Sequence, residues 1–237
     1  MGFGRCWRGT FIERPQFQDA GLKPHGEITN GEHHDKETVV GHPDRRCAGA
    51  PAAVREIWSC RQLGEVVKQA AGVSFSKYLQ DHITQPLGMA DTGMDQNLKV
   101  LPQRATGYGS DFSLAEYLDI SRVSTAGAMY STAEDLLRLD QGLYGTELVS
   151  AEAKMQMFTS HADASFSGYK GGSGYGWFIA DIFGHTRIDN GGVVNGFKTE
   201  LHRFPEEKFT VIVMVNHGNQ EPFVIAESIE QMIFVAP

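Results

Sequence analysis

The stretch from Arg187 to Asn216, RIDNGGVVNGFKTELHRFPEEKFTVIVMVN, constrains the fold of this chain more than any other. GFKTELHRFP alternates two sets of side chains as a β-strand does, and FTVIVMVN is a nearly all-apolar strand of the kind that is buried in a sheet. A turn at Pro205 separates the two strands. Asn190, Gly191 and Gly192 precede them, where a strand should begin. The pattern predicts an antiparallel sheet with two glycines on one of its strands.

The segments around this stretch predict further strands and several helices. GYGWFIADIFG and HTRIDNGG predict strands around a turn at Phe183-Gly184-His185, so we expect a three-stranded antiparallel meander. Three helix starts are marked by caps: Ser74, Ser131 with Glu134 in a capping box, and Ser150. Two helices should bury an apolar face, one through Leu63, Val66, Val67, Ala70 and Ala71, the other through Ile225, Ile229, Met232 and Ile233.

Helices followed by an antiparallel meander and a final helix indicate an α+β fold, with an antiparallel sheet flanked by helices and a helical subdomain. Within residues 61–237 we expect a mostly helical and loop part at 61–170 and the strands with the C-terminal helix at 171–237.

Residues 1–60 have a different composition. They hold all three cysteines, four of the nine histidines, and only 8 Ile, Leu, Val or Met, against 42 in the remaining 177 residues. Their charges cancel, so the net charge of −8 comes from the rest of the chain. A segment with so few aliphatic residues and no regular period buries little apolar surface. We therefore predict a boundary near residue 60 and a poorly ordered segment before it.

Several classes of function are disfavoured by composition and spacing. The net charge of −8 argues against nucleic acid as a partner. No apolar run approaches the roughly 20 residues that span a bilayer, and the N-terminus lacks the apolar core of a signal peptide, so the chain as written is expected to be cytoplasmic by default. The histidines and cysteine between residues 25 and 47 fit no zinc-ligand spacing. We expect no metal and no cofactor.

Residues 63–237 resemble the serine β-lactamase-related family, which includes class C β-lactamases, low-molecular-weight penicillin-binding proteins, D-aminopeptidases and esterases. The resemblance rests on LGEVVKQAAGVSFSKYLQDHITQPLGMADTGM, AGAMYSTAEDLLRL, GYGW and NGGVVNGFKTELHRFP followed by VIVMVN, which occur in family order. It implies a β-lactamase/transpeptidase-like fold whose N-terminal part is missing or replaced here. Family members are often exported.

The resemblance also implies a mechanism. In the family, the serine of a Ser-x-x-Lys motif attacks an acyl carbonyl, a Tyr-x-Asn loop assists proton transfer, and a His-x-Gly or Lys-Thr-Gly motif on a strand stabilises the oxyanion through a backbone N–H. Asn190-Gly191-Gly192 lies at the third-motif position. Asn can donate a hydrogen bond there but cannot carry the charge of an imidazolium. An alternative is that the two glycines merely form a turn.

The nucleophile is not found. It should lie in or before residues 1–60, where no Ser-x-x-Lys occurs. Trp58-Ser59-Cys60 occupies, weakly, the second-motif position, and Trp has no ionisable hydroxyl. Two motif-like stretches are better explained by structure: Ser74 to Lys77 as a helix cap with a solvent-facing lysine, and Lys198-Thr199-Glu200 as alternating strand residues.

Three functional hypotheses follow. The first is a serine hydrolase homologue for esters, D-amino-acid amides or β-lactams, truncated and inactive as written because both motifs are absent. The second is a non-catalytic peptide- or acyl-binding module, and the third is a fragment that binds nothing. Out-of-frame or misassembled sequence upstream of about residue 61 would explain its composition. Without the N-terminal strands of the family fold, an exposed sheet edge should favour self-association.

Overall fold

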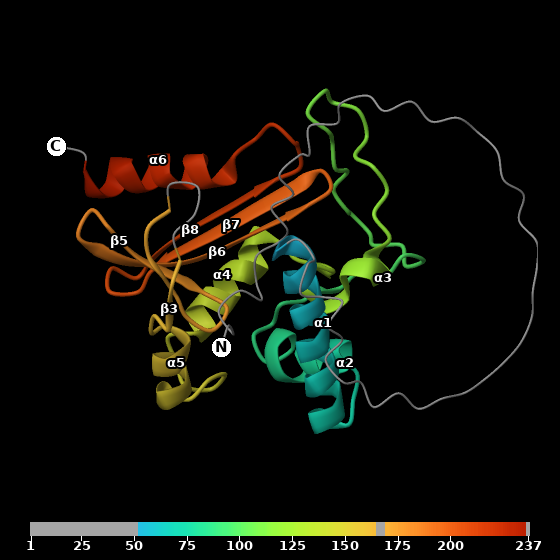
Figure 1. Ribbon diagram of the computed structural model, residues 1–237, viewed down its shortest axis with the longest axis horizontal. Helices are drawn as coiled ribbons and strands as arrows, with labels where there is room; N and C mark the ends of the chain where they lie inside the picture. The colour runs from blue at the N-terminus through green and yellow to red at the C-terminus, as the bar shows by residue number, and fades with distance from the viewer. Residues whose placement is uncertain (1–51, 165–168, 236–237) are drawn as a thin grey trace, which may run out of the picture.

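An antiparallel meander forms the centre of the computed structural model, which describes residues 52–164 and 169–235, with side chains from residue 60 onward. Six strands lie in the order β3-β4-β5-β6-β7-β8, so each pairs with the next along the chain (Figure 1). Their bounds are β3 (Ala162–Asp163), β4 (Gly172–Ser173), β5 (Phe178–Ile182), β6 (His185–Val194), β7 (Phe197–Phe204) and β8 (Phe209–Val215). The expected meander is confirmed, and it is larger than the three strands predicted.

Tight turns set the register of the long strands. Phe183 and Gly184 both have positive φ, 55° and 84°, as the two central residues of a type I′ hairpin turn require. Asn195 and Gly196 connect β6 to β7, and Gly196 also has a positive φ of 78°. The predicted turn after β5 is therefore confirmed.

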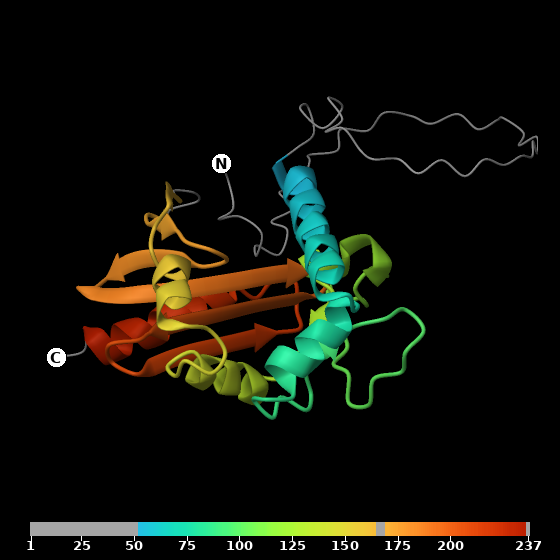
Figure 2. The ribbon, with the colours of Figure 1, turned by 90° about the horizontal axis from the view of Figure 1, so that it is seen from below.

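Helices cover both faces of the sheet. The C-terminal helix α6 (Pro222–Phe234) packs on one face over β7 and β8, and α4 (Ala133–Gly142) packs against β8 on the other face (Figures 1 and 2). At one end of the sheet lie α1 (Ala52–Ala71), α2 (Phe75–Leu79), the π-helical turn η2 (Gln80–Thr84), α3 (Ile120–Val123) and the turn η3 (Ser124–Ala126). The remaining elements are α5 (Ala151–Met157) and the two-stranded pair β1 (Gly93–Met94) and β2 (Met129–Tyr130). In the described part of the chain, no helix is long and apolar enough to cross a membrane.

Two of the three predicted caps lie where expected. Ser74 accepts from the backbone N–H of Lys77 at the start of α2, and Ser150 accepts from Ala153 at the start of α5. The cap of α4 is Thr132 and not Ser131. The hydroxyl of Ser131 instead forms a hydrogen bond of 2.7 Å with the hydroxyl of Thr92.

The predicted apolar face of α6 is wrong. Ile225, Met232 and Ile233 are 37%, 65% and 57% exposed, whereas Ala226 and Glu230 are fully buried. The spacing of the apolar residues alone does not mark Glu230 as part of the buried face. It is buried because Arg187 and His202 of the sheet pair with it. The apolar side chains that the sequence aligns on α6 therefore lie mostly outside its buried face.

The predicted apolar face of α1 is largely exposed too, with Leu63 at 43% and Val66 at 59%. The helix is held instead through Cys60 and Gly64. A Cβ at Gly64 would lie 2.4 Å from Cγ2 of Thr125, so only glycine allows this approach. Because α1 begins at Ala52 and residues 1–51 lie outside the described residues, the boundary near residue 60 stays a prediction.

Candidate active-site edge

The predicted third-motif residues lie inside a strand. Asn190, Gly191 and Gly192 belong to β6, and they pair with Leu201, Glu200 and Thr199 of β7. The alternative that the glycines form a turn is therefore wrong. On the other side of β6, pairing with β5 ends at Asp189, which lies opposite Phe178. In the described residues, the segment 190–194 thus pairs with a strand on one side only, and we call this segment the open edge of β6.

The two glycines face opposite sides of the sheet, because side chains alternate along a strand. Gly191 shares the α6 face with Asp189, and a Cβ on Gly191 would lie 2.3 Å from Oε1 of Glu200. The carboxylate of Glu200 thus fills the space above Gly191. Gly192 lies on the opposite face together with Asn190. Of the two glycines, Gly192 is therefore the one on the face away from α6.

The side chain of Asn190 is already bonded. Its Nδ2 donates to the carbonyl oxygen of Gly176 at 2.6 Å. Gly176 has a φ of 80°, in the left-handed region that favours glycine, and lies just before β5. The bond fixes the loop in front of β5 against β6 at the position where the two strands cease to pair.

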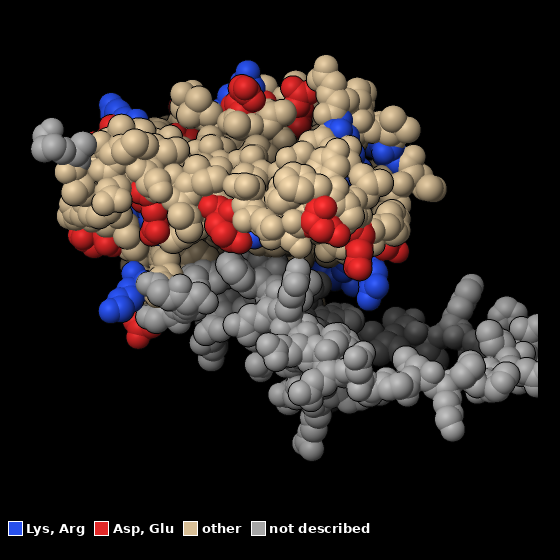
Figure 3. Space-filling model, turned by 90° about the horizontal axis from the view of Figure 1, so that it is seen from above, with Lys and Arg blue, Asp and Glu red and all other residues tan. Residues whose placement is uncertain are grey.

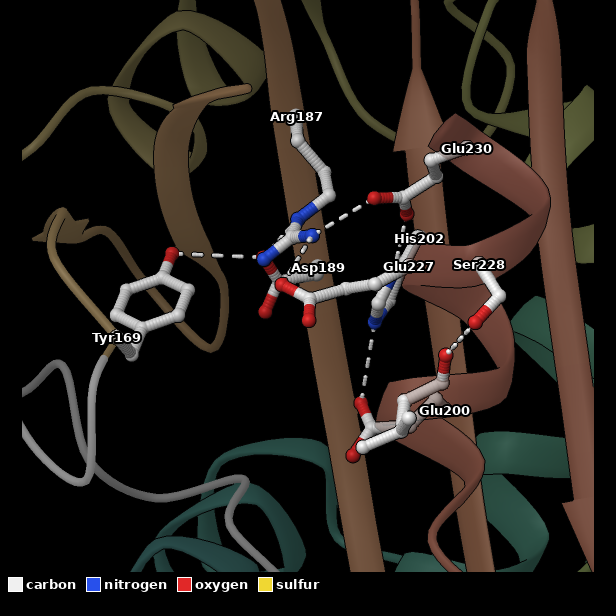
Figure 4. Close-up of polar contacts among 9 residues, drawn as sticks. Tyr169, Arg187, Asp189, Glu200, His202, Glu227, Ser228 and Glu230 are labelled. Carbon is white, nitrogen blue, oxygen red and sulfur yellow. Dashed lines mark hydrogen bonds and ion pairs between the residues drawn. The ribbon is translucent and has the colours of Figure 1, made fainter. Parts of the chain in front are cut away.

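A buried ionic network lies under the open edge, on the α6 face (Figure 4). Arg187 is fully buried; its Nε donates to Asp189 Oδ2 at 3.0 Å, and a terminal nitrogen donates to Glu230 Oε2 at 2.9 Å. The hydroxyl of Tyr169 donates to Asp189 at 3.4 Å. Burial alone would lower the pKa of Arg187, but Asp189 and Glu230 raise it above its usual range. Arg187 therefore stays charged and connects β6 to α6.

His202 is the second cation of the network. It is fully buried; its Nδ1 bonds to Glu230 Oε1, and its Nε2 lies 3.5 Å from Glu200 Oε2. Burial lowers the pKa of His202, but Glu200, Glu230 and Asp189 outweigh burial and raise it to about 9. His202 is thus an imidazolium at neutral pH. Through Glu200 it is linked to the space above Gly191.

The second-motif candidates lie in α1. The side chains of Trp58 and Ser59 are outside the described residues. Cys60 is buried, and its carbonyl oxygen accepts a hydrogen bond of 2.8 Å from the hydroxyl of Thr125. The roles predicted for Trp58, Ser59 and Cys60 stay predictions.

The motif-like stretches take the structural roles expected of them. Ser74 is a helix cap, and Lys77 is exposed and pairs with Asp81. Lys198 in β7 pairs with Glu221. Among the side chains that the structure describes, no group of three or more His, Cys, Asp or Glu is arranged so that it could hold a metal ion. The histidines between residues 25 and 42 lie outside the described residues.

The sequence prediction missed the ionic network. The sequence does contain a sign of this network. Arg187, Asp189 and His202 lie in the strand-like segments HTRIDN and ELHRF, next to apolar residues. Glu230 interrupts an otherwise apolar helix. Charged residues in such places need partners, because an unpaired buried charge is very costly.

Comparisons with known proteins agree on one family. Residues 58–231 match the family model Beta-lactamase. The chain is 26% identical over 158 residues to PbpX of Bacillus subtilis (strain 168), which is named as a penicillin-binding protein; the match covers 65% of this chain and 37% of that protein. The chain thus spans less than half the length of this relative.

Solved structures share the fold. An octameric penicillin-binding protein homologue from Pyrococcus abyssi superposes with a TM-score of 0.67 and 24% identity, over 75% of this chain and 41% of that one. The D-amino acid amidase from Ochrobactrum anthropi SV3 complexed with D-phenylalanine gives a TM-score of 0.64 and 21% identity, over 76% and 60% of the two chains. The expected β-lactamase/transpeptidase-like fold is confirmed.

Proposed function

This chain belongs to the β-lactamase family, and from that premise we propose that it is a homologue of the family's serine hydrolases, for ligands such as esters, D-amino-acid amides or β-lactams. We propose further that the sequence as given does not complete the acyl-serine reaction, because it contains neither Ser-x-x-Lys nor Tyr-x-Asn at the family positions. What it keeps is the strand along which such a ligand would lie.

The observation that carries this proposal is the open edge of β6. Backbone N–H and C=O groups at an unpaired strand edge can bond an extended ligand as an added strand would. A backbone N–H that points at a ligand carbonyl is also the element that stabilises an oxyanion. Gly192 carries no side chain on the face away from α6. These features support binding of an acyl or peptide ligand at residues 190–194.

The same features support the second candidate, a non-catalytic module that binds a peptide or acyl ligand. Ser74 is occupied as a helix cap, and the side chain of Asn190 is bonded to a backbone carbonyl. Neither is arranged as a nucleophile with a base at hydrogen-bond distance.

Covalent probes separate the two candidates. The purified chain would be incubated with a fluorophosphonate probe and with a labelled penicillin, and any modified residue would be identified by mass spectrometry. We expect no labelling. Acylation of Ser59 or Ser74 at a useful rate would refute the claim that the nucleophile is absent and would restore an active hydrolase.

Ligand binding is tested by calorimetry with D-phenylalanine amide and with an unlabelled penicillin. If either binds, Gly192→Val should weaken its affinity by about tenfold or more, because the new side chain covers the open edge. Thr186→Val is the matched control: it lies on the same strand but opposite Asp181 of β5, so affinity should not change. Equal loss in both variants would contradict the assignment of the site, and no binding of any ligand would favour the fragment that binds nothing.

We propose also that the chain self-associates through an exposed edge of its sheet. An unpaired strand edge offers backbone donors and acceptors that pair readily with another chain. Sedimentation equilibrium at increasing protein concentration tests this, and a monodisperse monomer with a sharp cooperative melt would contradict it.

A further inference from the structure

The register of the sheet decides which peptides of the open edge face a ligand. Two-residue loops close both hairpins of β6, and its residues next to these loops are His185 and Val194. Residues that flank such a loop form a hydrogen-bonded pair, and hydrogen-bonded and non-hydrogen-bonded pairs alternate along an antiparallel ladder. Counted from either loop, the backbone N–H and C=O groups of Gly191 and Val193 point away from β7. They are therefore the groups that the open edge presents to an extended ligand.

Glu200 lies directly on the first of these peptides. It is the partner of Gly191 across β6 and β7, and its carboxylate occupies the position that a Cβ on Gly191 would take. The side chain of Glu200 is only 15% exposed. Because Gly191 has no side chain of its own, the packed carboxylate of Glu200 restricts the movement of the Gly191 backbone on the α6 face of the sheet.

His202 holds the carboxylate of Glu200 in this place (Figure 4). Nε2 of His202 lies 3.5 Å from Oε2 of Glu200, and Nδ1 bonds to Glu230 of α6. The ring is fully buried and contacts the ring of Phe223 edge to face, with 5.3 Å between the ring centroids. A buried imidazolium N–H needs an acceptor, because an unpaired buried donor is costly. Glu200 therefore stays over Gly191 as long as His202 is protonated.

The charged groups that face His202 come from three elements of the fold. They are Glu200 on its own strand, Asp189 and Arg187 on β6, and Glu230 on α6. The residue opposite His202 on β8 is Val211, which carries no charge. Burial lowers the pKa of His202, but the three carboxylates outweigh burial and the charge of Arg187 and raise it to about 9. At the surface on the α6 side, charged side chains form small separate groups of both signs (Figure 3). The buried network, and not a surface patch, therefore sets the charge around Gly191.

Loss of the proton from His202 changes this arrangement. Nε2 of the neutral ring no longer attracts the carboxylate of Glu200 as an imidazolium does. An unpaired carboxylate favours water over a buried position, so Glu200 turns towards solvent. The backbone of Gly191 then loses the contact that restricts it. The protonation of His202 is in this way connected to the peptide that faces the ligand.

We propose that Glu200 is a positioning residue of the ligand site, which keeps the peptide of Gly191 directed at the ligand while His202 is protonated. This inference rests on the proposed function, because the ligand concerned is the one placed at the open edge. Glu200 lies on the α6 face and acts on the ligand through the backbone of Gly191.

Calorimetry of the full chain at pH 7, with penicillin and with D-phenylalanine amide, tests the effect on the ligand. Glu200→Ala should weaken the binding of either probe by about tenfold or more, because the Gly191 backbone loses its contact. Glu200→Gln keeps the shape of the side chain and an acceptor for His202, so it should keep the affinity within about threefold. The matched control is Glu206→Ala, an exposed glutamate in the turn between β7 and β8, which should leave the affinity unchanged. Circular dichroism checks that each variant is folded.

A pH titration followed by NMR tests the connection to His202 in the ligand-free protein. The amide signals of Gly191 and Val193 should move together as the pH rises from 7 to 10. In Glu200→Gln they should stay in place over this range, and in Glu206→Ala they should move as in the wild type. A purely structural role of Glu200 would lower stability without removing this dependence on pH.

The possible results separate this inference from the proposed function. An affinity that Glu200→Ala leaves unchanged would overturn the inference and leave the proposed function standing. Amide signals that titrate alike in wild type and Glu200→Gln would show that Glu200 does not connect His202 to the open edge, and would overturn it as well. If the wild type binds neither penicillin nor D-phenylalanine amide, the proposed function fails and the inference fails with it.

Discussion

Raising the pH from about 6.5 to above 9 should destabilise this protein through His202. Its pKa is raised in the folded state to about 9 from the ordinary value of 6.5, because Glu200, Glu230 and Asp189 outweigh the effect of burial. A raised folded-state pKa contributes stability that is fully present below pH 6.5 and is lost as the pH rises through 9. A shift of this size corresponds to roughly 3 kcal/mol, at about 1.4 kcal/mol per pH unit. His202 is fully buried, so solvent screening does not reduce this value.

The assay is urea unfolding at intervals between pH 6 and pH 10. The wild type should lose up to about 3 kcal/mol of unfolding free energy across this range relative to His202→Gln. The variant is less stable at pH 6.5 but has no imidazolium to lose, so its dependence on pH should be flatter. The matched control is His82→Gln, an exposed histidine, which should keep the wild-type slope. If wild type and His202→Gln show parallel curves between pH 6.5 and 9, His202 is not a buried cation and the network is assigned wrongly.

Two further predictions concern packing at the sheet. Gly191→Ala should lower the free energy of urea unfolding by about 1–3 kcal/mol, because the new Cβ would lie 2.3 Å from Glu200. Adding Glu200→Ala in the same chain should recover most of this loss. If Gly191→Ala costs the same with and without Glu200, this contact is contradicted. Arg203 and Asp140 form a buried ion pair between β7 and α4, so Arg203→Met should cost about 3–5 kcal/mol by leaving Asp140 unpaired. The double variant Arg203→Met/Asp140→Leu should cost less than the single one, and additive losses measured by thermal melts would show that the two residues do not depend on each other.

Local signals in the sequence were enough for the parts of the fold that depend on local contacts. The cap Ser74 acts within three residues of itself, and the turn at Phe183 and Gly184 is set by two backbone conformations. The alternation of β7 and the apolar character of β8 are likewise properties of each strand alone. The family resemblance placed these pieces in order, and the shared fold bears that order out.

The ionic network could not be predicted in the same way, because it depends on which residues face each other across strands. Asp189 lies opposite His202 only in the observed register of β6 and β7, and Glu230 reaches them from a helix 28 residues further along the chain than His202. The missed burial of Glu230 also explains the wrong face predicted for α6. A glutamate on an apolar helix favours solvent exposure unless its cationic partners are known.

The register of β6 also connects the network to the proposed ligand site. A slip of one residue between β6 and β7 would move Arg187, Asp189 and Gly191 to the opposite face of the sheet. The charges of Arg187 and Asp189 would then lose their partners Glu230 and His202. Each unpaired buried ion costs several kcal/mol. The network therefore holds the register that puts Gly192, and not Gly191, on the face away from α6. A variant such as Arg187→Met should for this reason weaken ligand binding at the open edge without removing any group that touches the ligand.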